Sequence, residues 1–160
     1  MRLVIADTGP IKYLVLIGCV DVLPRLFDRI ALPVAVQTEL SNPFAPVEVQ
    51  RWIATPPAWL EIHDSAGFLG VASGLDDGET AAIALAESLC ADMLLMDERD
   101  GCRVALEKGL RVTGTLGLLD LAAEHSLIDF SKAIHALERT TFRRPKALLI
   151  QLLAKHQPNE

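Results

Sequence analysis

The sequence predicts an α/β fold in which a central parallel sheet lies between two layers of helices, a three-layer α/β/α sandwich. Two observations carry this prediction. Short apolar runs, such as those at residues 3–6 and 93–96, contain no charged residue, as is typical of strands buried on both faces. Segments with helical periodicity follow these runs, and this alternation implies parallel strands joined by helices.

The predicted elements follow one another closely, and no linker is long enough to divide the chain. Residues 1–160 are therefore expected to form a single domain. Strands are predicted at residues 3–6, 29–32, 59–63, 93–96 and 111–113, with loops at 41–46 and 65–74. Helices are predicted at residues 11–17, 21–27, 33–40, 47–54, 79–91, 103–108, 116–124, 131–137 and 146–155.

Several residues are expected to begin or end these helices. Thr8 suits the N-cap of the first helix, and Pro10 suits its first turn. Glycines at positions 18 and 109 are expected to end the helices that precede them. The pair Asp76 and Glu79, three residues apart before an apolar run, predicts a capping box.

Composition excludes a membrane-spanning protein. Apolar residues make up 51% of the chain, but no apolar run approaches the ~20 residues that cross a bilayer. The apolar run at the N-terminus is too short for a secretory signal. A cytoplasmic location without membrane contact is therefore expected.

The formal net charge of −6 argues against a surface that binds nucleic acid by charge alone. An excess of acids is also expected where carboxylates gather around a divalent ion. Two groups of basic residues have the charge to contact phosphates, although solvated helix faces explain each member equally well. These residues are Arg99, Arg103, Lys108 and Arg111, then Arg139, Arg143, Arg144 and Lys146.

Histidine and cysteine give no sign of a zinc site or a redox pair. Cys19 and Cys90 are expected to be small buried residues, whereas Cys102 lies near the candidate site and its role stays open. The four histidines share no motif and are expected at or near the surface: His63, His125, His135 and His156.

Two predicted strands end in an aspartate, Asp7 after residues 3–6 and Asp97 after residues 93–96. Carboxyl ends of neighbouring parallel strands meet at one edge of a sheet. Carboxylates that meet there repel one another, and a divalent cation with oxygen ligands removes the conflict. A turn or helix cap explains either aspartate alone, so their joint placement carries the prediction. Two more acids, Glu39 and Glu79, are expected at the beginnings of helices.

A set of motifs occurs in a defined order over about residues 2–120. They are Val4-Ile5-Ala6-Asp7-Thr8-Gly9-Pro10-Ile11, Val36-Gln37-Thr38-Glu39-Leu40, Leu75-Asp76-Asp77-Gly78-Glu79-Thr80-Ala81-Ala82-Ile83, Leu95-Met96-Asp97-Glu98, Arg103-Val104-Ala105 and Val112-Thr113-Gly114-Thr115-Leu116-Gly117. Each motif alone is common, but the ordered set resembles the PIN-domain superfamily. Within it, the chain resembles the PIN-like toxins of bacterial and archaeal toxin–antitoxin operons (VapC-like ribonucleases).

This resemblance implies a three-layer α/β/α fold and an acidic cluster that binds Mg²⁺ or Mn²⁺ to cleave RNA. By position, the catalytic acids and metal ligands are Asp7, Glu39, Glu79 and Asp97, with Thr8 and Asp100 in possible supporting roles. The resemblance also implies a small antitoxin protein as partner and a homodimer. Two departures from the family pattern are a glutamate at position 79, where aspartate is frequent, and no aromatic residue after Asp97.

Two other functions are weighed against a nuclease. The chain is alternatively a binding module that keeps the fold, has weak or no catalysis, and acts through an antitoxin or a nucleic-acid partner. A phosphoryl-transfer domain, in which a strand-end aspartate is the nucleophile, is disfavoured. The receiver type needs an acidic pair before the nucleophile and a late lysine at a strand end, which this chain lacks, and Gly9 stands where the haloacid-dehalogenase type needs a second aspartate. The apolar segment at residues 147–153 suits either a dimer or antitoxin contact or packing within the chain.

Overall fold

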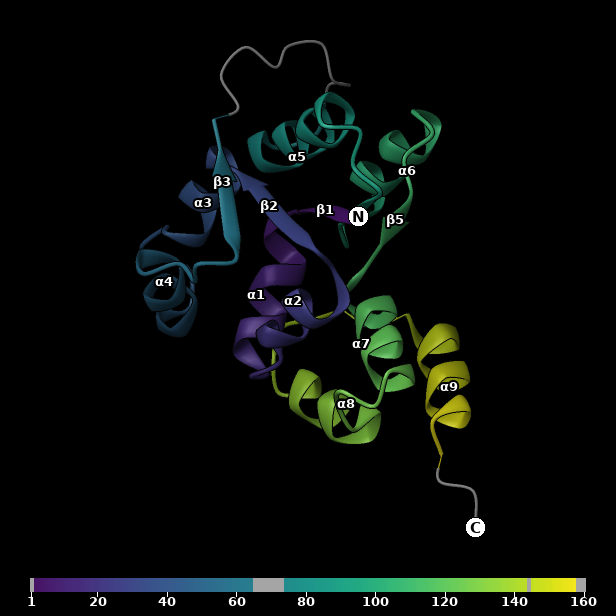
Figure 1. Ribbon diagram of the computed structural model, residues 1–160. Helices are drawn as coiled ribbons and strands as arrows, with labels where there is room; N and C mark the ends of the chain where they lie inside the picture. The colour runs from purple at the N-terminus through teal and green to yellow at the C-terminus, as the bar shows by residue number, and fades with distance from the viewer. Residues whose placement is uncertain (1, 65–73, 144, 158–160) are drawn as a thin grey trace.

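A five-stranded parallel sheet forms the centre of the computed structural model, which describes residues 2–64, 74–143 and 145–157 (Figure 1). The sheet order is β3-β2-β1-β4-β5, and every neighbouring pair is parallel. The strands are β1 (Leu3–Ala6), β2 (Arg29–Pro33), β3 (Leu60–His63), β4 (Met93–Leu95) and β5 (Val112–Thr113). The predicted strands and their parallel arrangement are confirmed.

The order in which the strands are added reverses at β1. From β1 the chain builds β2 and β3 on one side, and then adds β4 and β5 on the other side. In open parallel sheets, ligands bind beyond the carboxyl ends of the strands at such a reversal. Ala6 pairs with Leu95 there, so the residues that follow β1 and β4 are brought next to each other.

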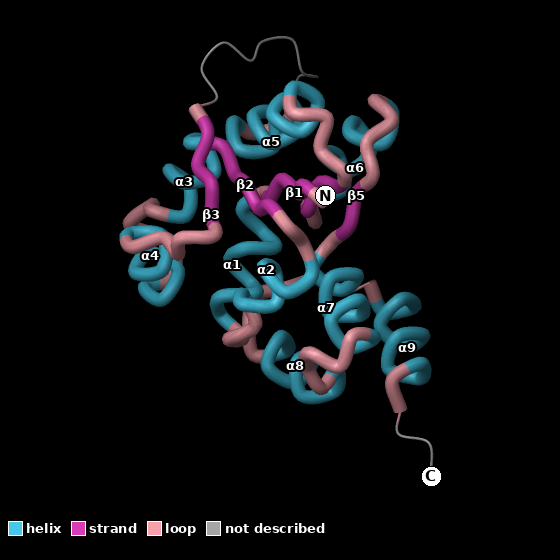
Figure 2. The backbone as a smooth tube through the Cα atoms, in the orientation of Figure 1, coloured by secondary structure: helices cyan, strands magenta, loops and turns pink. Residues whose placement is uncertain are grey.

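Helices cover both faces of the sheet, as the alternating side chains of β1 require. Val4 and Ala6 point into one core, while Leu3 and Ile5 point into the other. The second core lies against α5 (Asp77–Ser88) and α6 (Arg99–Glu107). Figure 2 shows these two helices on one side of the magenta strands and most of the remaining helices on the other. The predicted three-layer α/β/α fold is therefore confirmed.

The remaining helices pack around the first core. They are α1 (Thr8–Leu16), the 3₁₀ turn η1 (Val20–Val22), α2 (Leu23–Leu26), α3 (Val34–Leu40), α4 (Val47–Ala54), α7 (Thr115–Glu124), α8 (Phe130–Glu138) and α9 (Lys146–Lys155). Gly18 and Gly109 follow α1 and α6 with φ of 75° and 80°, the left-handed region that favours glycine. Both predicted helix ends are confirmed.

The last helix, α9, packs beside α7 rather than directly on the sheet (Figure 1). Lys155 and His156 of α9 both contact Asp120 of α7, at 2.9 and 2.7 Å. Leu152 is buried, but Ile150 remains 68% exposed. The helix therefore packs within the chain and still presents apolar side chains to solvent.

Four local predictions are wrong. The N-cap of α1 is Asp7 rather than Thr8, because Thr8 is already helical and its hydroxyl bonds to Glu39. Glu39 lies in the last turn of α3 rather than at a helix beginning, because α3 starts directly after Pro33 and ends at Leu40. Helix α6 begins at Arg99 rather than near residue 103, because the Glu98 side chain accepts hydrogen bonds from the Asp100 and Gly101 amides.

The fourth concerns the cysteines expected to be buried. Cys90 is exposed because it adopts a left-handed turn with φ of 51° just after α5, and Cys19 is only partly buried. The four histidines are exposed or partly buried, as predicted. The predicted loop at residues 65–74 lies outside the described residues except for Gly74, and Arg144 also lies outside them. No helix of the described residues is long and apolar enough to span a bilayer.

The stability of the fold is expected to depend on Leu95, which is fully buried in β4 two residues before Asp97. Leu95→Ala should lower the free energy of unfolding in urea by ~2–5 kcal/mol, because it removes buried methyl groups and leaves a cavity. Leu106→Ala is the matched control, since Leu106 is 60% exposed, and should change stability by about 0.5 kcal/mol or less. Equal losses in the two variants would contradict the assigned core.

Candidate metal centre

Six carboxylic acids line one cavity of about 450 Å³ beyond the carboxyl ends of β1 and β4. We call it the acidic cavity. The acids are Asp7, Glu39, Asp76, Glu79, Asp97 and Glu98, and Arg143 is the one basic side chain in the described lining. All four acids predicted for the site are therefore brought together. When ionised, these acids give the cavity wall a large excess of negative charge.

Asp7 follows β1 directly and lies at the N-terminus of α1. Its backbone amide donates to the Leu95 carbonyl at 2.9 Å, which fixes it against β4. The side chain is only 5% exposed, and its Oδ1 atom is buried with no hydrogen-bond partner among the described residues. Buried polar atoms nearly always have a partner, so this oxygen is open to a ligand.

Asp97 follows β4 and is held from the other side by α7. The Thr115 amide donates to Oδ1 at 2.7 Å, and the Thr115 hydroxyl donates to Oδ2 at 2.6 Å. A Cβ on Gly114 would lie 2.6 Å from Oδ1, so this close approach needs glycine at position 114. The two hydrogen bonds fix the carboxylate, and each oxygen keeps a second lone pair.

Glu39 reaches the cavity from the last turn of α3. The Thr8 hydroxyl donates a short hydrogen bond to its Oε2 atom. A Cβ on Gly78, at the beginning of α5, would overlap the Glu39 carboxylate. The predicted supporting role of Thr8 thus has a structural basis, although the acid that its hydroxyl contacts is Glu39 rather than Asp7.

Glu79 has two roles at the N-terminus of α5. Its amide donates to Asp76 Oδ1 at 2.7 Å, and its own Oε2 accepts from the Asp76 amide at 3.3 Å. This confirms the predicted capping box. The second hydrogen bond is long, so the Glu79 carboxylate is held only weakly in the cap. It is 8% exposed and also lines the acidic cavity.

Burial and crowding raise the pKa values of the predicted acids. Burial raises the pKa of Asp7 to about 8, with Asp76, Glu39 and Glu79 adding repulsion and the Thr8 backbone opposing it. Burial and then the charge of Asp76 raise the pKa of Glu79 to about 7. Burial also raises the pKa of Glu39 and of Asp97. These raised pKa values mean that the ionised carboxylates are disfavoured, because no cation among the described residues offsets their charge.

The donor set fits a hard divalent ion in its chemistry. Mg²⁺ and Mn²⁺ prefer carboxylate oxygens, and the buried Asp7 Oδ1 atom offers one without a competing hydrogen bond. Among the described residues, no group of three or more His, Cys, Asp or Glu side chains is already arranged to hold an ion. Ion binding would therefore require the carboxylates to move toward one another.

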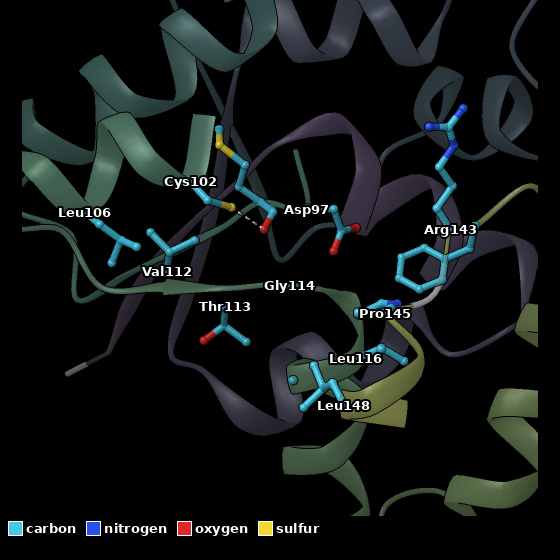
Figure 3. Close-up of a pocket in the computed structure, with 13 residues that line it drawn as sticks. Asp97, Cys102, Leu106, Val112, Thr113, Gly114, Leu116, Arg143, Pro145 and Leu148 are labelled. Atoms are coloured by element: carbon cyan, nitrogen blue, oxygen red, sulfur yellow. Dashed lines mark hydrogen bonds between the residues drawn. The ribbon is translucent and has the colours of Figure 1, made fainter. Parts of the chain in front are cut away.

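Two residues near the predicted site lie outside the acidic cavity. Asp100 is exposed in the first turn of α6 and lines a separate hollow with Arg99 and Arg103. The Cys102 thiol donates to the Met96 carbonyl at 3.3 Å, the dashed contact in Figure 3. Burial and the nearby acids raise the pKa of Cys102 to about 11, so it stays protonated at neutral pH and is a poor nucleophile.

Sequence reasoning assigned no site role to three residues that the structure places at the site. Asp76 was explained by its cap, Glu98 occurred only within a motif, and Thr115 stood 18 positions from the aspartate that it holds. A second acid directly after Asp97 is a local signal that could have drawn attention to Glu98. No local signal connects Thr115 to Asp97, because their contact depends on how β4 and β5 pair.

The sequence was compared with models of known protein families. The DUF3368 family model, described as a PIN domain, matches residues 3–158, nearly the whole chain. The chain belongs to this PIN-domain family. PIN domains are generally nucleases and typically use divalent metal ions, so membership supports a nuclease acting on nucleic acid. No curated protein matches the sequence significantly.

The raised pKa of Asp7 predicts how stability depends on pH in metal-free protein. An aspartate titrates near 3.9 in an unfolded chain, whereas the pKa of Asp7 in the folded protein is about 8. Between these values the folded state binds more protons, so the free energy of unfolding falls as pH rises. Urea titrations at pH 5 and pH 8 in a chelator should show a loss on the order of a few kcal/mol.

Asp7→Asn removes this charge and should reduce the loss between pH 5 and pH 8. Asp21→Asn, at an exposed aspartate of η1, is the control and should keep the wild-type pH dependence. If the free energy of unfolding of Asp7→Asn changed with pH as it does in the wild type, ionisation of Asp7 would not be the cause of the loss of stability.

Proposed function

We propose that this PIN domain is a Mg²⁺- or Mn²⁺-dependent ribonuclease that hydrolyses phosphodiester bonds in the acidic cavity. The observation that carries the proposal is the buried, unpartnered Asp7 Oδ1 atom in a cavity lined by five further acids. A protein gains nothing in stability from such an arrangement unless a cation joins it. Family membership supports the nuclease class, and the choice of RNA rests on the resemblance to PIN-like toxins.

The four acids have different parts in this proposal. Asp7 and Asp97, at the ends of adjacent strands, would hold the ion, with Glu39 and Glu79 around it. When bound, the ion supplies a water of lowered pKa and neutralises charge on the phosphate. Thr115 orients Asp97 and Thr8 orients Glu39. Hydrolysis forms a bond from water oxygen to phosphorus, breaks one P–O bond and returns a proton to the leaving oxygen.

Basic side chains flank the acidic cavity on two sides. Arg143 lines the cavity itself. Lys12 lines an adjoining hollow that shares Thr8 and Glu39 with it. Neither cation forms an ion pair with another described residue. In this proposal both would contact phosphates of the RNA, and these contacts would reconcile a negatively charged protein with an RNA substrate.

The biological role that we propose is that of the toxin in a toxin–antitoxin pair, acting in the cytoplasm. The resemblance to PIN-like toxins supports this role and implies a small antitoxin protein and a homodimer. The solvent-facing surface of α9 provides room for either contact. This part of the proposal depends on the resemblance more than on the site.

The hydrolysis proposal is tested by RNA cleavage with and without Mn²⁺. Asp7→Asn should reduce cleavage by roughly 100-fold or more, because it removes the carboxylate with the open oxygen. Asp100→Asn, which alters an exposed acid outside the cavity, should retain nearly wild-type cleavage. Circular dichroism would confirm that both variants are folded. Metal-independent cleavage, or full activity in folded Asp7→Asn, would contradict the proposal.

A second candidate function is a binding module with weak or no catalysis that acts through an antitoxin or nucleic-acid partner. It is favoured by one observation, that the described carboxylates do not already form a group able to hold an ion. The two functions differ in metal affinity. A nuclease must draw its carboxylates together around the ion, whereas a degenerate site need not bind it.

Isothermal titration with Mn²⁺ separates these two functions. Wild-type protein should bind the ion, and Thr115→Val should bind it roughly 10- to 100-fold more weakly, because Asp97 loses the hydroxyl that orients it. Thr115→Ser keeps the hydroxyl and should bind nearly as well as wild type. No binding heat in the wild-type protein would favour the binding module.

A further inference from the structure

A second cavity of about 450 Å³ lies beside the acidic cavity, and its walls are mainly apolar (Figure 3). We call it the apolar cavity. Its side chains come largely from α6, from β5, from the start of α7, from α9 and from the segment that leads into α9. They include Leu106, Val112, Leu116, Phe142, Pro145 and Leu148. Ligand sites are usually hollows of this size, mostly apolar with a few polar groups at defined positions.

The two cavities share a wall. Asp97, Phe142 and Arg143 line both of them. The Phe142 ring is fixed at this boundary by an edge-on contact with Tyr13, with ring centroids 5.0 Å apart. In Figure 3 the Arg143 guanidinium points away from Pro145, Leu116 and Leu148. A ligand that spans the boundary would therefore meet a cation, an aromatic ring and an apolar hollow in succession.

We propose that the apolar cavity binds the nucleoside next to the phosphate held in the acidic cavity, with its base against Phe142. This inference rests on the proposed function and names the part of the substrate that a neighbouring site recognises. A phosphodiester in the acidic cavity carries a nucleoside on each side. One of these nucleosides can pass the boundary at Phe142 and Arg143 and enter the apolar cavity. Arg143 contacts the phosphate there, and the base enters beyond it.

The lining matches the chemistry of a nucleobase. Bases stack on aromatic side chains, and this stacking is tolerant of sequence because every base has a π-face. The edge of a base needs polar partners, and the Thr113 side chain lines the cavity with no hydrogen bond to another described residue. The Cys102 thiol is already bonded to the Met96 carbonyl. Among the described residues that line it, the apolar cavity thus offers the Phe142 ring for stacking and the Thr113 hydroxyl for the base edge.

The test measures binding of a short, mixed-sequence single-stranded RNA carrying a fluorescent label, by anisotropy in Ca²⁺ so that cleavage is not needed. Leu148→Glu places a charge in the apolar cavity, and Ile150→Glu places the same charge on the same helix outside it. Both side chains are partly or largely exposed, so both variants should fold. Leu148→Glu should weaken binding about tenfold, and Ile150→Glu less than twofold.

An oligomer of the same length with abasic riboses provides the second comparison. Without bases, Leu148→Glu and Ile150→Glu should weaken binding equally. Phe142→Leu keeps the apolar volume but removes the ring, and should weaken binding of the RNA about fivefold or more while leaving the abasic oligomer unaffected. Equal effects of the two glutamate variants on the RNA, or an equal loss with the abasic oligomer, would overturn the inference.

Failure of this inference and failure of the proposed function give different results. If base-dependent loss of binding is seen but Mn²⁺ supports no cleavage, the nucleoside site stands and hydrolysis is wrong. If RNA is cleaved but the two glutamate variants bind it equally, the nucleoside site alone is wrong. If the RNA does not bind and Leu148→Glu instead dissociates an oligomer in gel filtration, the cavity is a protein interface and the inference is overturned.

Discussion

The burial of Asp7 is the constraint on which the rest of the site depends. This aspartate ends the central strand of the sheet, is 5% exposed, and has an oxygen with no partner among the described residues. An unpaired buried carboxylate destabilises a protein, and burial here raises the pKa of Asp7 to about 8. The hydrophobic cores on both faces of β1 must offset this cost. Keeping such a residue at the reversal of the strand order is costly for the fold, and the proposed binding of a cation would offset that cost.

Local features of the backbone bring three of the other acids, Asp97, Glu39 and Glu79, to the cavity. Glycine at position 114 lets Asp97 approach the start of α7, and glycine at position 78 lets Glu39 approach the start of α5. Glu79 is drawn in by its capping box with Asp76. The capping box would compete with the proposed metal binding, since the same Glu79 carboxylate serves the cap. The long 3.3 Å bond from the Asp76 amide makes that competition mild, because the bond contributes little to the cap.

Sequence reasoning predicted the sheet and the pair Asp7 and Asp97, because buried parallel strands and the acids that end them are adjacent in the chain. It placed Glu39 and Glu79 at the site only through the order of the motifs, and it placed Glu39 at the wrong end of its helix. It could not predict contacts such as Thr8 with Glu39, 31 positions apart. Nor did it find the boundary at Phe142, which contacts Tyr13 from the far end of the chain. Contacts of this kind depend on tertiary packing, for which local patterns carry no information.

If the proposed function is correct, the charge of the cavity relates metal binding to RNA binding. Six acids and one arginine line the cavity, so a phosphate would be repelled by the ionised acids unless divalent ions offset part of their charge. Binding of metal and binding of RNA are then coupled, and each must strengthen the other by the same factor. Contacts to phosphate weaken as salt rises, whereas stacking in the apolar cavity depends less on salt. A protein with a net charge of −6 would therefore draw much of its affinity for RNA from the bound ion and from the base, rather than from a basic surface.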